Sequence, residues 1–118
     1  MKLYNFSHPL TQEQLDDIAC CRDIASADIN QYDIKVQLDL NAPLRAQISN
    51  IVDHVNFKLG EELFVVLPGQ APAAVVLTDM LLSRGAQVNV VRFGQQSTPS
   101  GTMFPFREII RLQLYIMA

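Results

Sequence analysis

The chain has 118 residues, of which 49% are hydrophobic and 18% charged, with a formal net charge of −3 and a pI near 5.2. This length predicts one domain, and the acidic balance argues against a nucleic-acid binder that works through a broad basic surface. It leaves room for a small, highly charged ligand held in one local pocket. The high apolar fraction predicts that some surface is buried against a second subunit.

The cysteines and the N-terminus indicate where such a protein works. Cys20 and Cys21 are adjacent, so they are poorly placed to form a structural bridge with each other. We expect two reduced thiols that pack at a helix end, in a cytoplasmic protein. The N-terminus shows no signal-peptide pattern, and no apolar run is long enough to span a bilayer, so we expect no membrane association.

The first unit of the chain is a strand followed by a helix. Residues 3–6 predict a short strand that a Ser-His-Pro turn closes. Thr11 and Gln14 have the spacing of a capping box, and apolar residues then recur at helical spacing, so we predict a helix over residues 12–21. Residues 22–32 show no strong period and are typical of a loop or of an irregular lead into a strand.

The second unit predicts another strand and helix. Residues 34–40 alternate strictly between apolar and polar, which is typical of a strand with one buried face near a sheet edge. Asn41 is expected to cap the next helix, with Pro43 just inside its first turn. The apolar stripe of that helix runs to Val55, and Gly60 is expected to end it.

The central unit reads as strand, tight turn, helix and strand. Residues 63–67 are an unbroken apolar run, typical of a strand buried on both faces. Pro72 stands in the first turn of a helix predicted over about 71–84, Gly85 is its C-terminal stop, and residues 87–93 form the next strand. The helix is apolar on nearly every side. One sheet face cannot cover all of this apolar surface, so we expect a second subunit to bury the rest.

The last part of the chain predicts a loop and a strand. Residues 94–103 are rich in glycine, serine and proline, which predicts a flexible loop or a lid ordered by ligand. The apolar residues of 104–116 fit both the two-residue period of a strand and the spacing of a helix, and their β-branched residues favour a strand. The order of elements predicts an α/β fold with a mostly parallel sheet, right-handed crossovers and helices on both faces.

The turn after the third strand is the first candidate for a ligand site. Unpaired N–H groups and the positive dipole end of the following helix favour an anion there. Pro68, Gly69 and Gln70 form this turn, which lacks the lysine of the P-loop and the glycines of the dinucleotide fingerprint. A tight turn that binds nothing is an equally good interpretation.

The turn after the first strand should lie on the same rim of the sheet. His8 can act there as a general acid or base or as a phosphate donor, although a turn histidine bonded to its own backbone is commoner. Ser7 can donate to a phosphate or cap a turn. Arg92 can reach a phosphate from a strand end or face solvent. His54 is expected on the surface, and we predict no metal site and no cofactor.

Three blocks of sequence carry a resemblance to a known family. They are Asn5-Phe6-Ser7-His8-Pro9-Leu10-Thr11, Leu67-Pro68-Gly69 with Ala71-Pro72-Ala73-Ala74, and Glu108-Ile109-Ile110. Through them the chain resembles, from residue 1 to about 113, the Csx-fifteen family of small CRISPR-associated proteins of type III systems. The opening block is the most specific, and residues 94–103 and 114–118 do not help the match.

The resemblance implies a compact Rossmann-like (CARF-like) domain, related to those that sense cyclic oligoadenylates, the second messengers of type III immunity. It also implies a ring nuclease or a binder that removes the messenger. Carried onto this sequence, it points to ligand-binding residues in the two turns: Asn5, Ser7 and His8, and Pro68, Gly69 and Gln70.

Three functions remain open at this point. The first is a cytoplasmic homodimer that binds cyclic oligoadenylate, foremost cyclic tetra-adenylate, at the subunit interface and damps signalling. It would do so by sequestration or by metal-independent attack of a ribose 2′-hydroxyl, with His8 assisting proton transfer. Whether ligand joins dimers into larger assemblies is left open. The second is a protein interaction module without a nucleotide ligand, and the third is a small flavin or nucleotide enzyme.

Overall fold

The computed structural model describes residues 1–112 and has one five-stranded sheet at its centre, in the order β2-β1-β3-β4-β7. The first four of these strands in sheet order run parallel, and β7 is antiparallel to β4. This is a small Rossmann-like α/β fold, as predicted. The strands are β1 (Lys2–Asn5), β2 (Asn30–Asp33), β3 (Glu62–Val66), β4 (Gln87–Phe93) and β7 (Phe106–Arg111).

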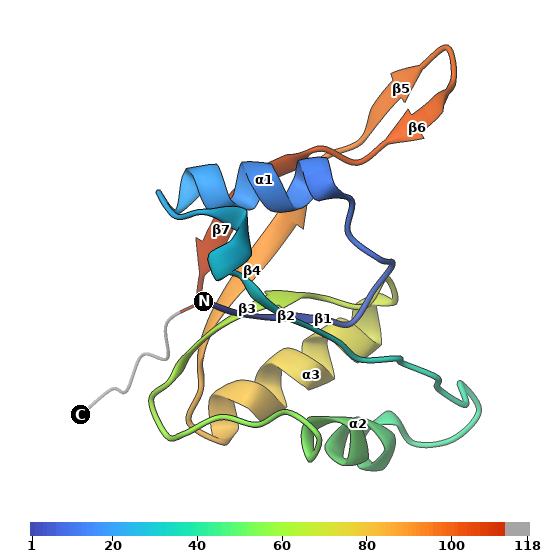
Figure 1. Ribbon diagram of the computed structural model, residues 1–118. Helices are drawn as coiled ribbons and strands as arrows, with labels where there is room; N and C mark the ends of the chain where they lie inside the picture. The colour runs from blue at the N-terminus through green and yellow to red at the C-terminus, as the bar shows by residue number, and fades with distance from the viewer. Residues whose placement is uncertain (113–118) are drawn as a thin grey trace.

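Helices cover both faces of the sheet. Figure 1 shows α1 (Gln12–Cys21) on one face, and α2 (Leu44–Val52) and α3 (Ala71–Ser83) on the other. Two separate clusters of buried side chains follow from this layering. Within β3, Leu63 and Val65 join the cluster beneath α2 and α3, whereas Phe64 and Val66 join the cluster beneath α1. Because β3 is buried on both faces, its sequence is apolar without alternation.

The elements with the clearest local signals have the predicted bounds. The capping box is present, since the Gln14 N–H donates to the Thr11 hydroxyl and the Thr11 N–H donates to the Gln14 side chain. Helix α1 begins and ends where predicted. Gly85 follows α3 with a φ of +92°, a conformation that favours glycine. It turns the chain into β4, which also has the predicted bounds.

The strand predicted over residues 34–40 is absent from the sheet. β2 ends at Asp33, and the Ile34 N–H makes the last hydrogen bond to this edge, to the Asn5 carbonyl. Beyond that point β1 has ended, so no partner strand is left. Residues 34–40 continue as an extended segment whose Ile34, Val36 and Leu38 pack on the core beneath α2 and α3. The alternation of apolar and polar residues over 34–40 therefore reflects the packing of one side of this segment, not pairing with another strand.

Helix α2 is shorter than predicted at both ends. It begins after Pro43 with no side-chain cap, so Asn41 does not cap it. The Gln47 side chain instead holds the preceding loop through hydrogen bonds to its backbone. The helix ends at Val52, and Gly60, with a φ of +81°, lies in the turn that leads into β3.

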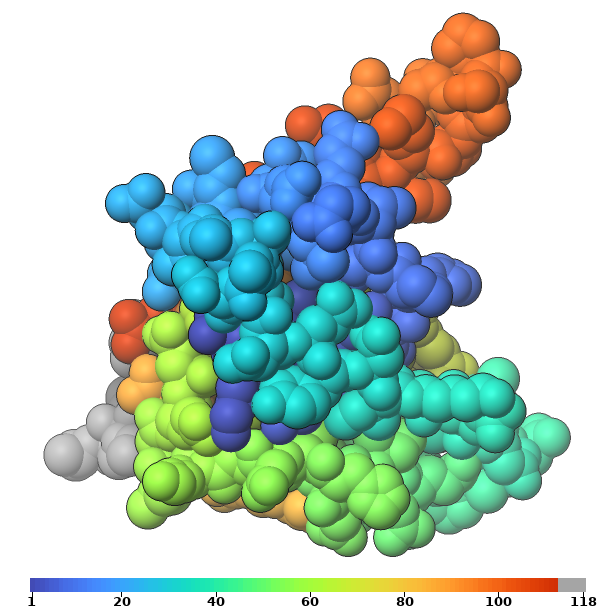
Figure 2. Space-filling model, in the orientation of Figure 1, coloured from blue at the N-terminus to red at the C-terminus, as the bar shows by residue number. Residues whose placement is uncertain are grey.

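The segment predicted as a loop or lid contains a two-stranded antiparallel hairpin, β5 (Gln96–Thr98) and β6 (Gly101–Met103). It projects from the body of the molecule in Figures 1 and 2. The strand predicted over residues 104–116 is confirmed for β7, and residues 113–116 of that prediction lie outside the described residues.

The apolar surplus of α3 is covered in part by α2, which lies against it. Ion pairs join the two helices, Arg45 to Asp79 at 3.1 Å and Arg84 to Asp53 at 2.7 Å. Val75 stays 68% exposed, so a smaller apolar surface than the sequence indicated remains for a partner. Within residues 1–112 no helix is long and apolar enough to cross a membrane.

The expected packing of the two cysteines is wrong. Cys20 and Cys21 are free thiols, and both are exposed. α1 contacts the sheet through the face that carries Ile18 and Ala19, its buried residues. The cysteines follow in the last turn, on positions that this face leaves in solvent.

Candidate functional site

The two predicted turns meet at one edge of the sheet. β1 and β3 are parallel neighbours, with Asn5 opposite Val66, so the segments that leave them lie together. A cleft of about 570 Å³ opens there, which we call the rim cleft. Figure 2 shows the surface hollowed between the blue loop that follows β1 and the teal extended segment. Its lining residues are Phe6, Ser7, His8, Ile34, Lys35, Val36, Leu38, Leu40, Pro68, Gly69, Gln70 and Ala73.

The turn after β1 is held by the side chain of Asn5. This residue is only 1% exposed. Its Oδ1 accepts a hydrogen bond from the Ser7 N–H at 3.0 Å, and its Nδ2 donates to the His8 carbonyl at 2.9 Å. Asn5, predicted as a ligand contact, does not line the rim cleft, and its side chain holds the shape of the turn.

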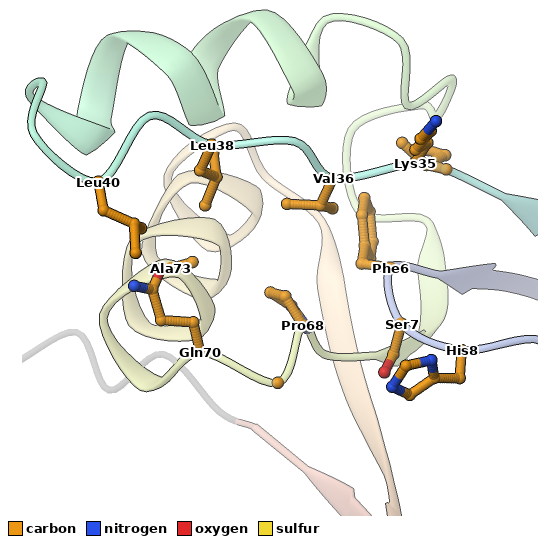
Figure 3. A pocket seen from close by; sticks show the side chains of 12 residues that line it. Phe6, Ser7, His8, Lys35, Val36, Leu38, Leu40, Pro68, Gln70 and Ala73 are labelled. Atoms are coloured by element: carbon orange, nitrogen blue, oxygen red, sulfur yellow. The ribbon is translucent and has the colours of Figure 1, made fainter.

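Ser7 and His8 are exposed on this turn. In Figure 3 their side chains lie next to each other at the open side of the rim cleft. Within residues 1–112 neither side chain makes a hydrogen bond, so the imidazole is not bonded to its own backbone. Both groups are therefore available to a ligand.

The turn after β3 leads into a helix whose N-terminus is open. Gln70 is the N-cap of α3, but no side chain caps the helix, and its first turn carries no acidic residue. The Gln70 Oε1 is buried without a hydrogen-bond partner among the described residues. By contrast, the Thr11 capping box satisfies the N-terminus of α1. Of these two helices, α3 is the one whose first amides remain free for an anion.

Gly69 is not required by the fold. Its φ lies outside the left-handed region, and a Cβ built on it would meet no atom within 4 Å. Yet it lines the rim cleft between Pro68 and Gln70. A glycine at such a position leaves the backbone open to close approach by a ligand.

The extended segment supplies a third wall that the sequence analysis did not place at the site. In Figure 3 Val36, Leu38 and Leu40 point from this segment toward Pro68 and Ala73. Lys35 is exposed beside them, and within residues 1–112 no carboxylate lies at ion-pair distance from its amine. Five other cations are paired: Lys2, Arg22, Arg45, Arg84 and Arg92. The end of a parallel strand just before Lys35 is the signal that could have placed it on this rim.

Arg92 and His54 lie elsewhere. The Arg92 guanidinium pairs with the Glu108 carboxylate at 3.0 Å across β4 and β7, and Arg92 does not line the rim cleft. The structure therefore does not bring this predicted ligand residue to the site. His54 is exposed beyond the end of α2. Within residues 1–112 no three His, Cys, Asp or Glu side chains gather as metal ligands.

The two groups with shifted pKa values, Lys2 and Glu61, lie at the other end of β1 and β3 from the rim cleft. A hydrogen bond from the Lys58 N–H, and then the Lys2 ammonium at 3.1 Å, lower the pKa of Glu61. The same contact raises the pKa of Lys2. These groups join the start of β1 to the residue before β3, so they hold the two strands in place and take no part in the rim cleft.

Comparison of the chain with known protein families, with curated proteins and with solved structures found no match.

Proposed function

We propose that the protein is a cytoplasmic homodimer that binds cyclic oligoadenylate, foremost cyclic tetra-adenylate, in the rim cleft and lowers its free concentration, which damps type III CRISPR signalling. One observation carries the proposal. The turn after β1 and the turn after β3, both of which lie in the sequence blocks that carry the resemblance, line a single cleft beside an uncapped helix N-terminus.

Phosphate binding at this cleft needs no basic protein surface. The free amides at the start of α3 carry the positive end of its dipole, and Lys35 adds a cation that no carboxylate neutralises within residues 1–112. The net charge of −3 is then no obstacle, because the attraction is local. Ser7 and His8 add side-chain donors from the other turn.

A second copy of the chain suits a ring-shaped ligand. A cyclic tetra-adenylate is compatible with a two-fold axis, and an isologous dimer presents each donor twice across that axis. Leu40 is 65% exposed at the wall of the rim cleft. A partner that covers this side chain would bury apolar surface and close the site around the ring.

Cleavage, where it occurs, needs only groups that the ligand and this site supply. A ribose 2′-oxygen attacks the adjacent phosphorus, and the bond to the 5′-oxygen breaks. The products are a 2′,3′-cyclic phosphate and a free 5′-hydroxyl. The proton leaves the 2′-hydroxyl for a base, and the departing 5′-oxygen gains one. His8 is the side chain in the rim cleft suited to this transfer.

The test separates binding from cleavage. Purified protein in excess is incubated with radiolabelled cyclic tetra-adenylate and a metal chelator, and one sample is run on native and denaturing gels. A retarded native band with an intact ring means sequestration, and linear products mean a ring nuclease. No shift and no product would overturn the proposal. A protein partner from lysate would then favour the interaction module, and a yellow colour the flavin enzyme.

His8→Ala tests the proton transfer. If His8 carries the proton, cleavage in single turnover should fall by about 10²-fold, because general acid–base groups contribute that much or more. Binding should weaken by only roughly 2- to 10-fold, as for the loss of one hydrogen-bond donor. Quenched samples on denaturing gels give the rate, and native gels give the affinity. An unchanged rate would remove His8 from the chemistry and leave the binding proposal intact.

Lys35→Gln tests the electrostatic part of binding. We expect the Kd for cyclic tetra-adenylate to rise roughly 1.5- to 5-fold, as for one exposed charge contact, and the loss to shrink as salt is added. Titration at two salt concentrations measures both effects. Lys58→Gln removes the same charge from an exposed residue outside the rim cleft and should leave the Kd unchanged. Equal effects of the two variants would contradict a contact at Lys35.

A further inference from the structure

A second cleft, of about 650 Å³, lies on the other side of the turn that follows β1. We call it the α1 cleft, because the first turns of α1 form one of its walls. The residues between the hairpin and β7 form another, and Val66 and Phe93 come from the ends of β3 and β4. Ser7 and His8 line both clefts. The rim cleft and the α1 cleft are therefore neighbours that share one two-residue turn.

The α1 cleft is unsuited to an anion. Glu13 and Asp17 contribute carboxylates to its lining, and they would repel a phosphate. The helix N-terminus beside it offers little in return, because the Thr11 hydroxyl already accepts from the Gln14 N–H at 3.1 Å. The two clefts thus differ in chemistry: the rim cleft suits an anionic group, and the α1 cleft repels one.

Flat apolar surface is what the α1 cleft does offer. Phe93, Met103, Phe104 and Leu10 line it, and Phe104 and Met103 are 54% and 47% exposed. The wall is fixed, since the Gln14 Nε2 donates to the Phe104 carbonyl at 2.7 Å and ties this segment to α1. An exposed aromatic ring in the same cleft as two carboxylate acceptors suits a planar heterocycle that carries an amino group.

We propose that the α1 cleft is the base-binding part of the site. One adenine of the ligand stacks on Phe104 there, and its exocyclic amine donates to the Asp17 or Glu13 carboxylate. The adjoining phosphate lies across the shared turn in the rim cleft. This inference rests on the proposed function and adds to it a reason for adenine: the carboxylates accept from an amine and reject a carbonyl.

The first experiment is titration of Phe104→Ala with cyclic tetra-adenylate. The hydrogen bond from Gln14 uses the backbone of residue 104, so the wall is kept while the stacking face is lost. We expect the Kd to rise roughly 5- to 100-fold, the range for loss of one base–aromatic stack. Ile110→Ala is the control, because Ile110 is also an exposed apolar residue but lines neither cleft. Its Kd should match that of the wild type.

The second experiment keeps the protein unchanged and alters the base. A ring of the same size with hypoxanthine in place of adenine offers a carbonyl where adenine has its amine. We expect it to bind the wild type about 10-fold more weakly, and the double variant Glu13→Gln with Asp17→Asn to lose most of this preference because amides can donate.

The outcomes distinguish this inference from the function on which it rests. If Phe104→Ala binds the adenylate ring as tightly as the wild type does, the base-binding role of the α1 cleft is overturned and the proposed function is not. The same holds if the wild type binds the two rings equally. A wild type that binds neither ring overturns both.

Discussion

Replacement of Asn5 by alanine is expected to lower the free energy of unfolding by about 1 to 3 kcal/mol and to abolish measurable ligand binding. The variant removes both bonds of a nearly fully buried side chain, which leaves the Ser7 N–H and the His8 carbonyl without partners. Each lost hydrogen bond contributes about 0.5 to 1.5 kcal/mol, because water can reach the two groups on this exposed turn. The turn that presents Ser7 and His8 then loses its fixed shape. Denaturant unfolding gives the first effect, and titration with cyclic tetra-adenylate, under conditions where the variant is folded, gives the second.

Asn89→Ala is the matched control for Asn5→Ala. Asn89 is the other buried polar residue of the described chain, and its Nδ2 donates to the Leu63 carbonyl at 3.3 Å within the sheet. We expect a loss of about 1 to 2 kcal/mol and an unchanged Kd, since this bond lies away from both clefts. If Asn89→Ala weakened binding as much as Asn5→Ala, the effect would reflect stability alone and Asn5 would have no positioning role.

Replacement of Gly69 by valine is expected to leave stability within about 0.5 kcal/mol and to weaken binding by roughly 10² to 10⁴-fold. The backbone tolerates a side chain here, because φ is not left-handed and a Cβ has free space. That free space is where a phosphate must come to reach the first amides of α3. Blocking about two charge-assisted hydrogen bonds, at about 1.5 to 3 kcal/mol each, gives the expected loss. Thermal unfolding and titration with cyclic tetra-adenylate measure the two quantities.

Gly85→Ala should show the opposite pattern. Gly85 has a φ of +92°, a backbone conformation that other residues rarely adopt, so we expect a clear loss of stability. The residue lies far along the chain from both turns and lines neither cleft, so the Kd of the folded protein should not change. A Gly69→Val protein that binds like the wild type would exclude close approach of the ligand at this turn.

The elements whose bounds could be predicted are those that begin or end at a capping residue or a turn glycine. Thr11 and Gln14 define the start of α1, and Gly85 defines the turn into β4, so these bounds required no knowledge of neighbours. Residues 34–40 could not be assigned in this way. An alternating pattern arises equally from strand pairing and from packing of one side of an extended chain, and only the end of β1 at Asn5 decides between them.

The site follows the same division. The parallel topology was enough to bring the turns at His8 and Gly69 to one rim, because neighbouring parallel strands end together. Lys35 was missed because its place depends on where β2 ends, and Arg92 was misplaced because its partner Glu108 comes from a strand of uncertain period. The α1 cleft depends on a hairpin of two three-residue strands whose sequence shows no apolar alternation.

The three walls of the rim cleft come from segments far apart in the chain, around His8, Lys35 and Gly69. None of them can form the site alone, so the unfolded chain has no comparable affinity for any ligand of this cleft. By mass action such a ligand must stabilise the folded protein, by about 2.7 kcal/mol when its free concentration is 100 times the Kd. Under the proposed function, the abundance of the messenger would help to set the lifetime of the protein, a feedback that needs no further regulator.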